Sequence, residues 1–360
     1  MKLVPLGPLA GRSAAEPLPK PRFDHLQRMT SQLGLWEHAL FTTPRTEHGF
    51  CTDDNARALI VACRQPDPSP DLVTLAGIYL TFLQDAQLTD GGFHNRRNSD
   101  GSWTNEVASD DSQGRALWAI GSVASRGPAS WMREAGLNRF DKQRYFASPS
   151  PRANAFAVLG AFEVLLVSPD HQTALHILEQ CVGHLLVRND DRWPWPEDRL
   201  AYDNARIPEA LMDAGALLSR NGLMDAGLRL LEWLVEMETL DGHFSFTPVG
   251  GWEPDEPRPG FDQQPVEAAA MADACFRAWS LTGDSRWKDL VERAARWFVG
   301  ANDSRLVLYD RKTGGCGDGL SRDHINLNRG AESTLAALAV LQLADNIERS
   351  EAHQSGISKA

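Results

Sequence analysis

The chain has 360 residues, and its 36 basic and 48 acidic side chains give a formal net charge of −12 at pH 7. This acidic balance disfavours nucleic acid and anionic membranes as partners, because both need a basic face on the protein. A hydrophobic fraction of 42% and a charged fraction of 23% are ordinary for a globular protein, and no apolar run is long enough to cross a bilayer. We therefore predict no nucleic-acid partner and no membrane partner.

The two ends of the chain differ from its centre in composition. Residues 1–20 contain several prolines and lack the apolar core of a signal peptide, so we predict a disordered tail there and a second one at 347–360. Residues 21–346 then form a single catalytic domain. The five cysteines are odd in number and have no Cys-x-x-Cys spacing, which disfavours a disulfide framework and a zinc site. We expect a cytoplasmic protein without a metal or cofactor.

Six segments share one pattern: they open with polar or small residues and continue as apolar runs rich in alanine and leucine at helical spacing. A helix that is apolar on all sides is a buried helix. The recurrence along the chain is typical of a repeat architecture. In chain order, these segments start at Asp54, Asp111, Pro151, Asp203, Gln264 and Arg329.

Amphipathic segments alternate with the apolar ones. They show apolar residues at i, i+3, i+4 and i+7, the pattern of a half-exposed helix. A pair of one apolar and one amphipathic helix cannot bury its own apolar face, so the pairs must close into a ring. We predict an all-α (α/α)6 toroid with six inner and six outer helices. The outer helices are expected near 22–34, 71–88, 129–146, 170–188, 222–238 and 284–299.

The connections between these helices are unequal in length. Those that lead from an outer to an inner helix are long, and the stretch 240–246 has an Asp-Gly turn followed by alternating aromatic and polar residues, which predicts a short hairpin. The connections from inner to outer helices are short. One rim therefore carries the long loops together with the inner-helix N-termini, and long structured loops usually carry function.

Carboxylates gather at this predicted rim. Asp54, Asp111 and Asp203 open inner helices, and Glu267 and Glu332 lie about one turn inside two others. Each aspartate could simply cap a helix. The carboxylates could also form buried pairs with nearby arginines that hold the helix starts in register. Carboxylates on apolar helices are costly unless they are paired or face a wet cavity, so we predict that these five include the catalytic residues.

Aromatic, histidine and arginine side chains accompany the carboxylates. A tryptophan beside polar groups suits sugar recognition, because its ring covers the apolar face of a pyranose while the polar groups bind hydroxyls. Packing between loops is the alternative role. The candidate substrate-binding residues are Arg57, His94, Trp103, Trp195, Arg206 and His324. Carboxylates that face one another across the centre of the ring favour hydrolysis of a glycosidic bond. We expect inversion, because a wide separation of the two carboxylates leaves room for a water molecule between them.

The sixfold pattern resembles the (α/α)6-toroid carbohydrate enzymes, which include inverting glycoside hydrolases and N-acylglucosamine 2-epimerases. The strings at 48–59 and 193–198 also resemble a poorly characterised bacterial helical family that accompanies glycosyltransferases and mannoside-processing enzymes. The resemblance implies an oligosaccharide substrate and a partner among glycosyltransferases or other carbohydrate enzymes. Two alternatives remain: a sugar epimerase with His94, His243 or His324 as base, and a non-catalytic glycan-binding partner of a glycosyltransferase.

Overall fold

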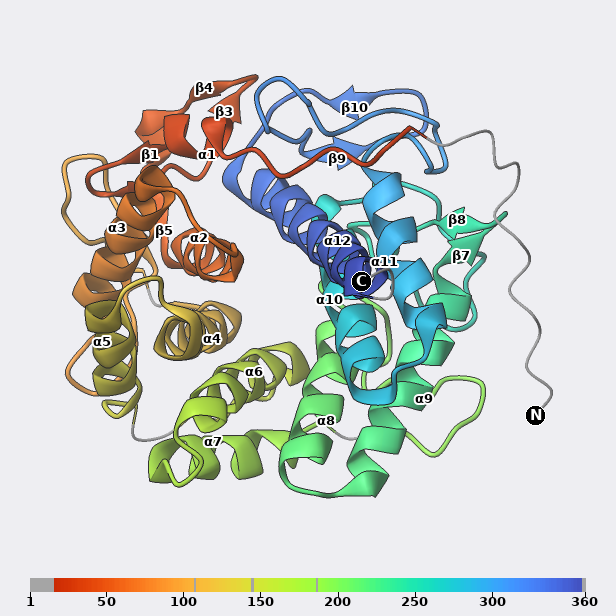
Figure 1. Ribbon diagram of the computed structural model, residues 1–360, viewed down its shortest axis with the longest axis horizontal. Coiled ribbons are helices and arrows are strands. Elements are labelled where there is room, and N and C mark those ends of the chain that lie inside the picture. The colour runs from red at the N-terminus through yellow and green to blue at the C-terminus, as the bar shows by residue number, and fades with distance from the viewer. Residues whose placement is uncertain (1–15, 107, 144–145, 186, 358–360) are drawn as a thin grey trace.

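The inner helices form a closed ring in the computed structural model, which describes residues 16–357 except 107, 144–145 and 186 (Figure 1). Each inner helix contacts the next one along the chain, and the last contacts the first. In chain order they are α2 (Thr52–Arg64), α4 (Asp110–Arg126), α6 (Pro151–Val167), α8 (Arg206–Leu217), α10 (Pro265–Thr282) and α12 (Ala331–Ile357). The predicted (α/α)6 toroid is confirmed.

An outer layer of helices packs on this ring, one outer helix against each inner helix. In α11 the buried positions Trp287, Leu290, Val291 and Ala294 follow the spacing of a single helix face, so the apolar stripe lies against α10. Helices α5, α7 and α11 lie inside their predicted ranges, and α3 and α9 each begin one residue before theirs. The outer helices are α1 (Asp24–Arg28), α3 (Pro70–Ala86), α5 (Ser130–Phe140), α7 (Gln172–Val182), α9 (Asn221–Met237) and α11 (Ser285–Trp297).

The first outer helix is much shorter than the predicted range 22–34. It ends at Arg28, and the chain then forms a hairpin from β1 (Thr30–Ser31) and β2 (Gly34–Leu35). Gly34 has a φ of +140°, and a Cβ atom there would lie 2.8 Å from the ring of Phe82 on α3. This close approach and the left-handed backbone require glycine. The helix prediction was wrong here because contacts with distant residues determine the conformation.

The long connections confirm the predicted asymmetry. Every strand among the described residues lies between an outer helix and the following inner helix, and the strands pair as antiparallel two-residue ribbons. At the hairpin predicted near 240–246, Asp241 and Gly242 have φ values of +49° and +86°, as a type I′ turn requires. The remaining strands are β3 (Ala39–Leu40), β4 (Thr43–Pro44), β5 (Phe50–Cys51), β6 (Arg96–Arg97), β7 (Thr239–Leu240), β8 (His243–Phe244), β9 (Gly319–Leu320) and β10 (Ile325–Asn326).

Both ends of the described chain differ from the predicted tails. Helix α12 continues through Ile357, so the expectation of disorder from residue 347 is corrected as far as the helix extends. At the other end, Lys20 forms ion pairs with Asp345 and Glu348, each at 2.6 Å, which fix the segment from residue 16 against α12. The rest of the predicted N-terminal tail, residues 1–15, lies outside the described residues.

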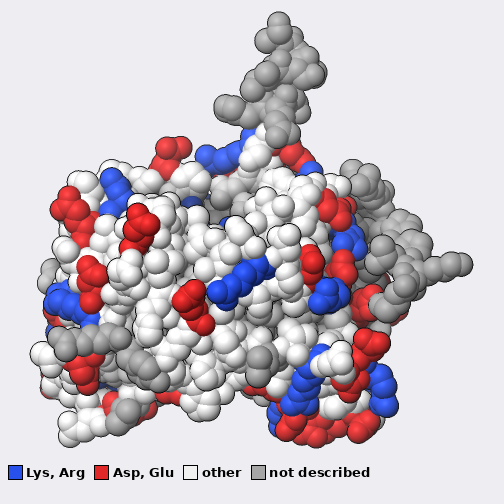
Figure 2. All heavy atoms as spheres, turned by 90° about the horizontal axis from the view of Figure 1, so that it is seen from below, with Lys and Arg blue, Asp and Glu red and all other residues white. Residues whose placement is uncertain are grey.

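The inner helices approach each other closely because they are rich in small residues. Gly121 of α4 faces Gly160 of α6, and a Cβ atom on Gly121 would lie 2.1 Å from the carbonyl oxygen of Gly160. None of the described helices is long and apolar enough to span a membrane. On the side of the ring shown in Figure 2, acidic and basic side chains are interspersed among uncharged ones.

Candidate active site

A polar cavity of about 550 Å³ opens at the N-terminal ends of α2, α4 and α12. We call it the cup. Three of the five predicted catalytic carboxylates line it: Asp54 on α2, Asp111 on α4 and Glu332 on α12. The helix order places Asp54 between the other two, because α2 contacts both α4 and α12. The cup is also lined by Glu37, His38, Cys51, Asp53, Arg57, Asn95, Arg96, Glu106, Tyr202, Gln264 and Asp318.

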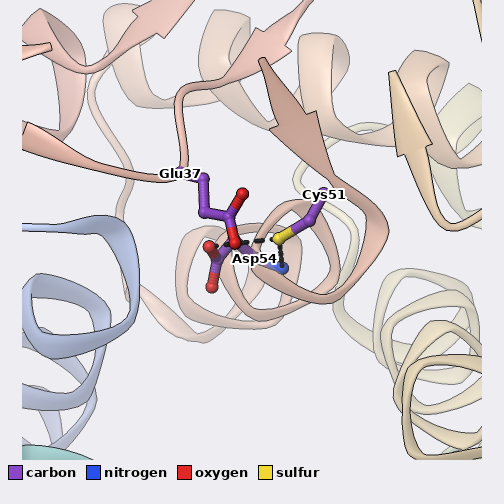
Figure 3. Close-up of side chains that lie close together, drawn as sticks. All are labelled: Glu37, Cys51 and Asp54. Atoms are coloured by element: carbon purple, nitrogen blue, oxygen red, sulfur yellow. Dashed lines mark hydrogen bonds between the residues drawn. The ribbon is translucent and has the colours of Figure 1, made fainter. Parts of the chain in front are cut away.

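Asp54 is held at the first turn of α2 by Cys51, the residue that caps this helix. The Cys51 thiol accepts a hydrogen bond from the backbone N–H of Asp54 at 3.4 Å and donates one to the Asp54 carboxylate at 3.2 Å (Figure 3). Burial raises the pKa of Asp54 to about 7; Arg57 lowers it, and Glu332 adds to the increase. Asp54 can therefore both hold and release a proton near neutral pH, as a general acid must.

Asp111 has a different environment from Asp54. One of its carboxylate oxygens accepts a hydrogen bond from the Ser150 hydroxyl at 2.9 Å, and the other accepts one from the Tyr202 hydroxyl. The two hydroxyl groups hold the Asp111 carboxylate in place from both sides. The cup therefore contains Asp54, whose pKa is raised by burial, beside Asp111, which is held by two hydroxyl groups.

Arg57 joins three carboxylates and thereby fixes their positions. Its Nη1 atom lies 2.5 Å from Asp53 and 2.9 Å from Asp54, while its Nη2 atom lies 2.8 Å from Glu332. Both terminal nitrogens are thus engaged within the protein. The geometry gives Arg57 a positioning role, in contrast to the expected direct contact with substrate.

Asp203 lies beneath the cup, inside the ring, and is fully buried. It pairs with Arg115 at 2.8 Å and with Arg206 at 3.2 Å. Burial alone would raise the pKa of Asp203, but these arginines outweigh that effect and hold it below its ordinary value. Arg206 also pairs with Glu209 at 2.8 Å and so contacts only protein groups here. For Asp203 and Arg206 the arrangement matches the alternative of buried pairs that hold the helix starts.

Glu267 is also buried away from the cup. Its carboxyl group accepts hydrogen bonds from the backbone N–H groups of Asp203 at 2.5 Å and Asn204 at 3.3 Å. Burial raises the pKa of Glu267 well above its ordinary value. Its contacts fix the turn that leads into α8, which is a structural role.

The same four-residue string, Asp-Asn-Ala-Arg, begins α2 at Asp54 and precedes α8 at Asp203. These helices occupy opposite positions in the ring (Figure 1). In both copies the arginine pairs with the aspartate three residues before it. The Asp54 copy lines the cup, whereas the fully buried Asp203 lines a smaller cavity inside the ring, so the identical strings have different chemical settings.

The predicted aromatic and histidine residues are not gathered in the cup. His94 and Trp103 stack on each other with ring centres 4.9 Å apart, outside the residues that line the cavity. Trp195 is fully buried and donates from its indole nitrogen to Glu197 at 3.2 Å, which is loop packing. His324 is exposed and lines a neighbouring cavity.

Several cup residues were not among the predicted site residues. Glu37 is held by Arg96 through two contacts of 2.5 and 2.7 Å, and no motif in the sequence singled out either residue. Asp318, in the loop before α12, also lines the cup. Tyr202 could have been found, because it directly precedes the second Asp-Asn-Ala-Arg string.

Glu37, Cys51 and Asp54 are the one group among the described residues whose ligand atoms lie within 4.8 Å of one another, a spacing that could hold a metal ion (Figure 3). Their chemistry does not fit such a site as arranged. Burial raises the pKa of the Cys51 thiol, and the thiol already donates to the Asp54 carboxylate. Arg96 and Arg57 already neutralise the two carboxylates.

No family model and no curated protein matches the sequence. Solved structures do match the fold. A sugar epimerase from a ruminal bacterium superposes with a TM-score of 0.68 at 11% identity, covering 90% of this chain and 95% of that one. A D-mannose isomerase gives 0.64 at 11% identity, covering 89% and 94%. The GH76 α-mannanase of Bacteroides thetaiotaomicron gives 0.60 at 11%, covering 90% and 94%. At this identity the likeness shows the shared toroid fold.

Proposed function

We propose that the protein is a carbohydrate-active enzyme that hydrolyses a glycosidic bond of an oligosaccharide in the cup. The observation that carries the proposal is a pair of carboxyl groups in one cavity on adjacent helices: burial raises the pKa of Asp54 to about 7, and Asp111 is held by the hydroxyl groups of Ser150 and Tyr202. Glycoside hydrolysis needs one protonated and one ionised carboxyl. The structural neighbours, which include a mannanase, support the carbohydrate class.

In the proposed mechanism, the Asp54 carboxyl donates its proton to the oxygen of the leaving sugar. Asp111 acts as a general base and removes a proton from a water molecule, whose oxygen attacks the anomeric carbon from the opposite face. The glycosidic C–O bond breaks, and the product has the inverted configuration. Tyr202 and Ser150 hold Asp111, and Arg57 keeps the Asp54 side chain aligned with Glu332.

A sugar epimerase is the second candidate, because the sugar epimerase and the D-mannose isomerase share the fold. Its expected bases do not gather in the cup, however. His94 stacks on Trp103, His243 pairs with Asp303 at 2.6 Å on the rim, and His324 is exposed in another cavity. Carboxylate chemistry fits the cup better. A non-catalytic glycan-binding partner of a glycosyltransferase would use the same cavity without turnover.

The test is an oligosaccharide screen with mannosides and glucosides of several linkages, followed by NMR from the first minutes. We expect a new reducing end whose initial anomer is inverted. Asp54→Asn and Asp111→Asn should each lower the rate by at least ~100-fold, while Asp71→Asn on the exposed start of α3 serves as the matched control. A product of unchanged mass would identify an epimerase. Saturable binding without any product would identify a binding protein.

A further inference from the structure

A second cavity, of about 580 Å³, adjoins the cup on the rim. We call it the rim groove. It lies between the β9–β10 hairpin, the loop before α10 and Phe41 in the β3–β4 hairpin. Gln264 and Asp318 line both cavities, so the rim groove and the cup are neighbours that meet at these two side chains. Each has the size of a small-molecule pocket, roughly 300–1,000 Å³, and the two together suit a chain of linked rings more than a single ring.

The rim groove combines exposed apolar side chains with amide and hydroxyl groups, two aspartates and one histidine. Phe41, Val249 and Leu327 are 57%, 67% and 53% exposed, which is unusual for such large hydrophobic residues. Ser321 and Asn326 lie in the same lining. An aromatic face beside hydroxyl and amide groups can cover the C–H side of a sugar ring and bind its hydroxyls.

Phe41 is held in a strained conformation at the edge of this groove. Its φ is +52°, a left-handed value that costs energy for a bulky residue and that the surroundings must impose. Its backbone N–H donates to the Asn328 side chain at 3.0 Å, and its carbonyl accepts from the backbone N–H of Arg329 at 3.0 Å. The two contacts tie the β3–β4 hairpin to the segment that enters α12 (Figure 1). A rigidly presented, exposed aromatic ring is a binding platform rather than core packing.

Asp318 is fixed where the two cavities meet. One of its oxygens accepts from the backbone N–H of Gly330 at 2.6 Å and from the Ser333 hydroxyl at 2.5 Å. Its position is thus set by the start of α12, the helix that also carries Glu332. A ligand that spans both cavities must pass this side chain.

The charges of the two cavities restrict the ligand. The rim groove has no lysine or arginine in its described lining. In the cup, Arg57 and Arg96 are already paired with carboxylates. A uronate, sulfate or phosphate would therefore find no unpaired lysine or arginine in the described linings, only the histidines His38 and His324, and the surrounding carboxylates would repel it.

We propose that the rim groove is a second sugar-binding subsite, which receives the continuation of an uncharged oligosaccharide whose end lies in the cup. This inference rests on the proposed carbohydrate function. It predicts that affinity and kcat/KM rise with oligosaccharide length until the groove is filled, and that Phe41 carries much of that gain.

The experiment measures binding by calorimetry and cleavage by product analysis on a neutral series from disaccharide to hexasaccharide. Wild type is compared with Phe41→Ala and Leu327→Ser, and Leu240→Ala is the control because Leu240 is an exposed hydrophobic on β7 outside the groove. We expect each groove variant to reduce the long-to-short ratio of affinity about tenfold, the scale of one lost apolar contact. Thermal melting of every variant checks its fold.

The outcomes separate the subsite from the proposed hydrolysis. Cleavage of short and long substrates with equal kcat/KM would overturn the subsite and leave hydrolysis standing. Length-dependent binding that Phe41→Ala removes, without cleavage, would support the subsite and overturn hydrolysis. Absence of both binding and cleavage would overturn both. Equal binding of a uronic-acid oligosaccharide would overturn the restriction to uncharged ligands.

Discussion

Replacing Asp54 by asparagine should change how the stability of the protein depends on pH. Burial raises the pKa of Asp54 from an ordinary value of 3.8 to about 7. Since one pKa unit corresponds to about 1.4 kcal/mol, a shift of about three units amounts to ~4 kcal/mol. The folded state binds the Asp54 proton more tightly than the unfolded state does. The contribution of this proton to the free energy of unfolding is therefore fully present below about pH 4 and is lost as the pH rises to about 7. Asparagine cannot ionise and avoids the loss.

The assay is urea unfolding of wild type and Asp54→Asn between pH 5 and 8, followed by tryptophan fluorescence. We compare the two proteins by the difference in free energy of unfolding, variant minus wild type. This difference should increase by up to roughly 1.4 kcal/mol per pH unit between about pH 5 and 7 and then level off. Asp71→Asn, on the exposed start of α3, should show a constant difference. A constant difference for Asp54→Asn as well would refute the raised pKa and, with it, the assignment of the general acid.

Four further substitutions test the site and the ring. Tyr202→Phe should lower kcat about 10- to 100-fold without unfolding the protein, because Asp111 loses a charge-assisted hydrogen bond; an unchanged kcat would argue against Asp111 as base. Asp203→Asn should destabilise the fold by up to about 3–5 kcal/mol in thermal and urea unfolding, since it takes one carboxylate from each of two buried arginines, which keep their pairs with Asp53, Glu209 and Asp273. Gly121→Ala should destabilise the fold by ~1–3 kcal/mol through overpacking. Gly222→Ala, whose added Cβ atom meets nothing within 4 Å, should stabilise the fold by about 0.5–1 kcal/mol. Equal effects of the two substitutions would contradict the close contact between α4 and α6.

The fold could be predicted because its signals are local. The stripe from Trp287 to Ala294 indicates an outer helix by itself, and the alternation of such helices with apolar ones requires a ring. The hairpin that follows α1 could not be predicted in this way. It depends on Gly34 lying against Phe82, a contact between segments that no short pattern records.

The site was only partly predictable, for a related reason. Asp54 and Asp203 begin the same four-residue string, and nothing within the string distinguishes them. Asp54 faces the cup because Glu332, from the other end of the chain, stands beside it. Asp203 is sealed by Arg115 of α4. Glu37 had no sequence signal at all, since its role comes from its contact with Arg96.

The contact between the first and last inner helices has a consequence for synthesis of the chain. Arg57 near the start must find Glu332 near the end, and Lys20 must find Asp345. Until α12 leaves the ribosome, the apolar flank of α2 that it covers has no partner, and the nascent chain is exposed to misassembly. A chain arrested before residue 331 should therefore be protease-sensitive, and the cup should form only after α12 has been added to the ring. In this ring, the last helix completes the fold and the binding site in one step.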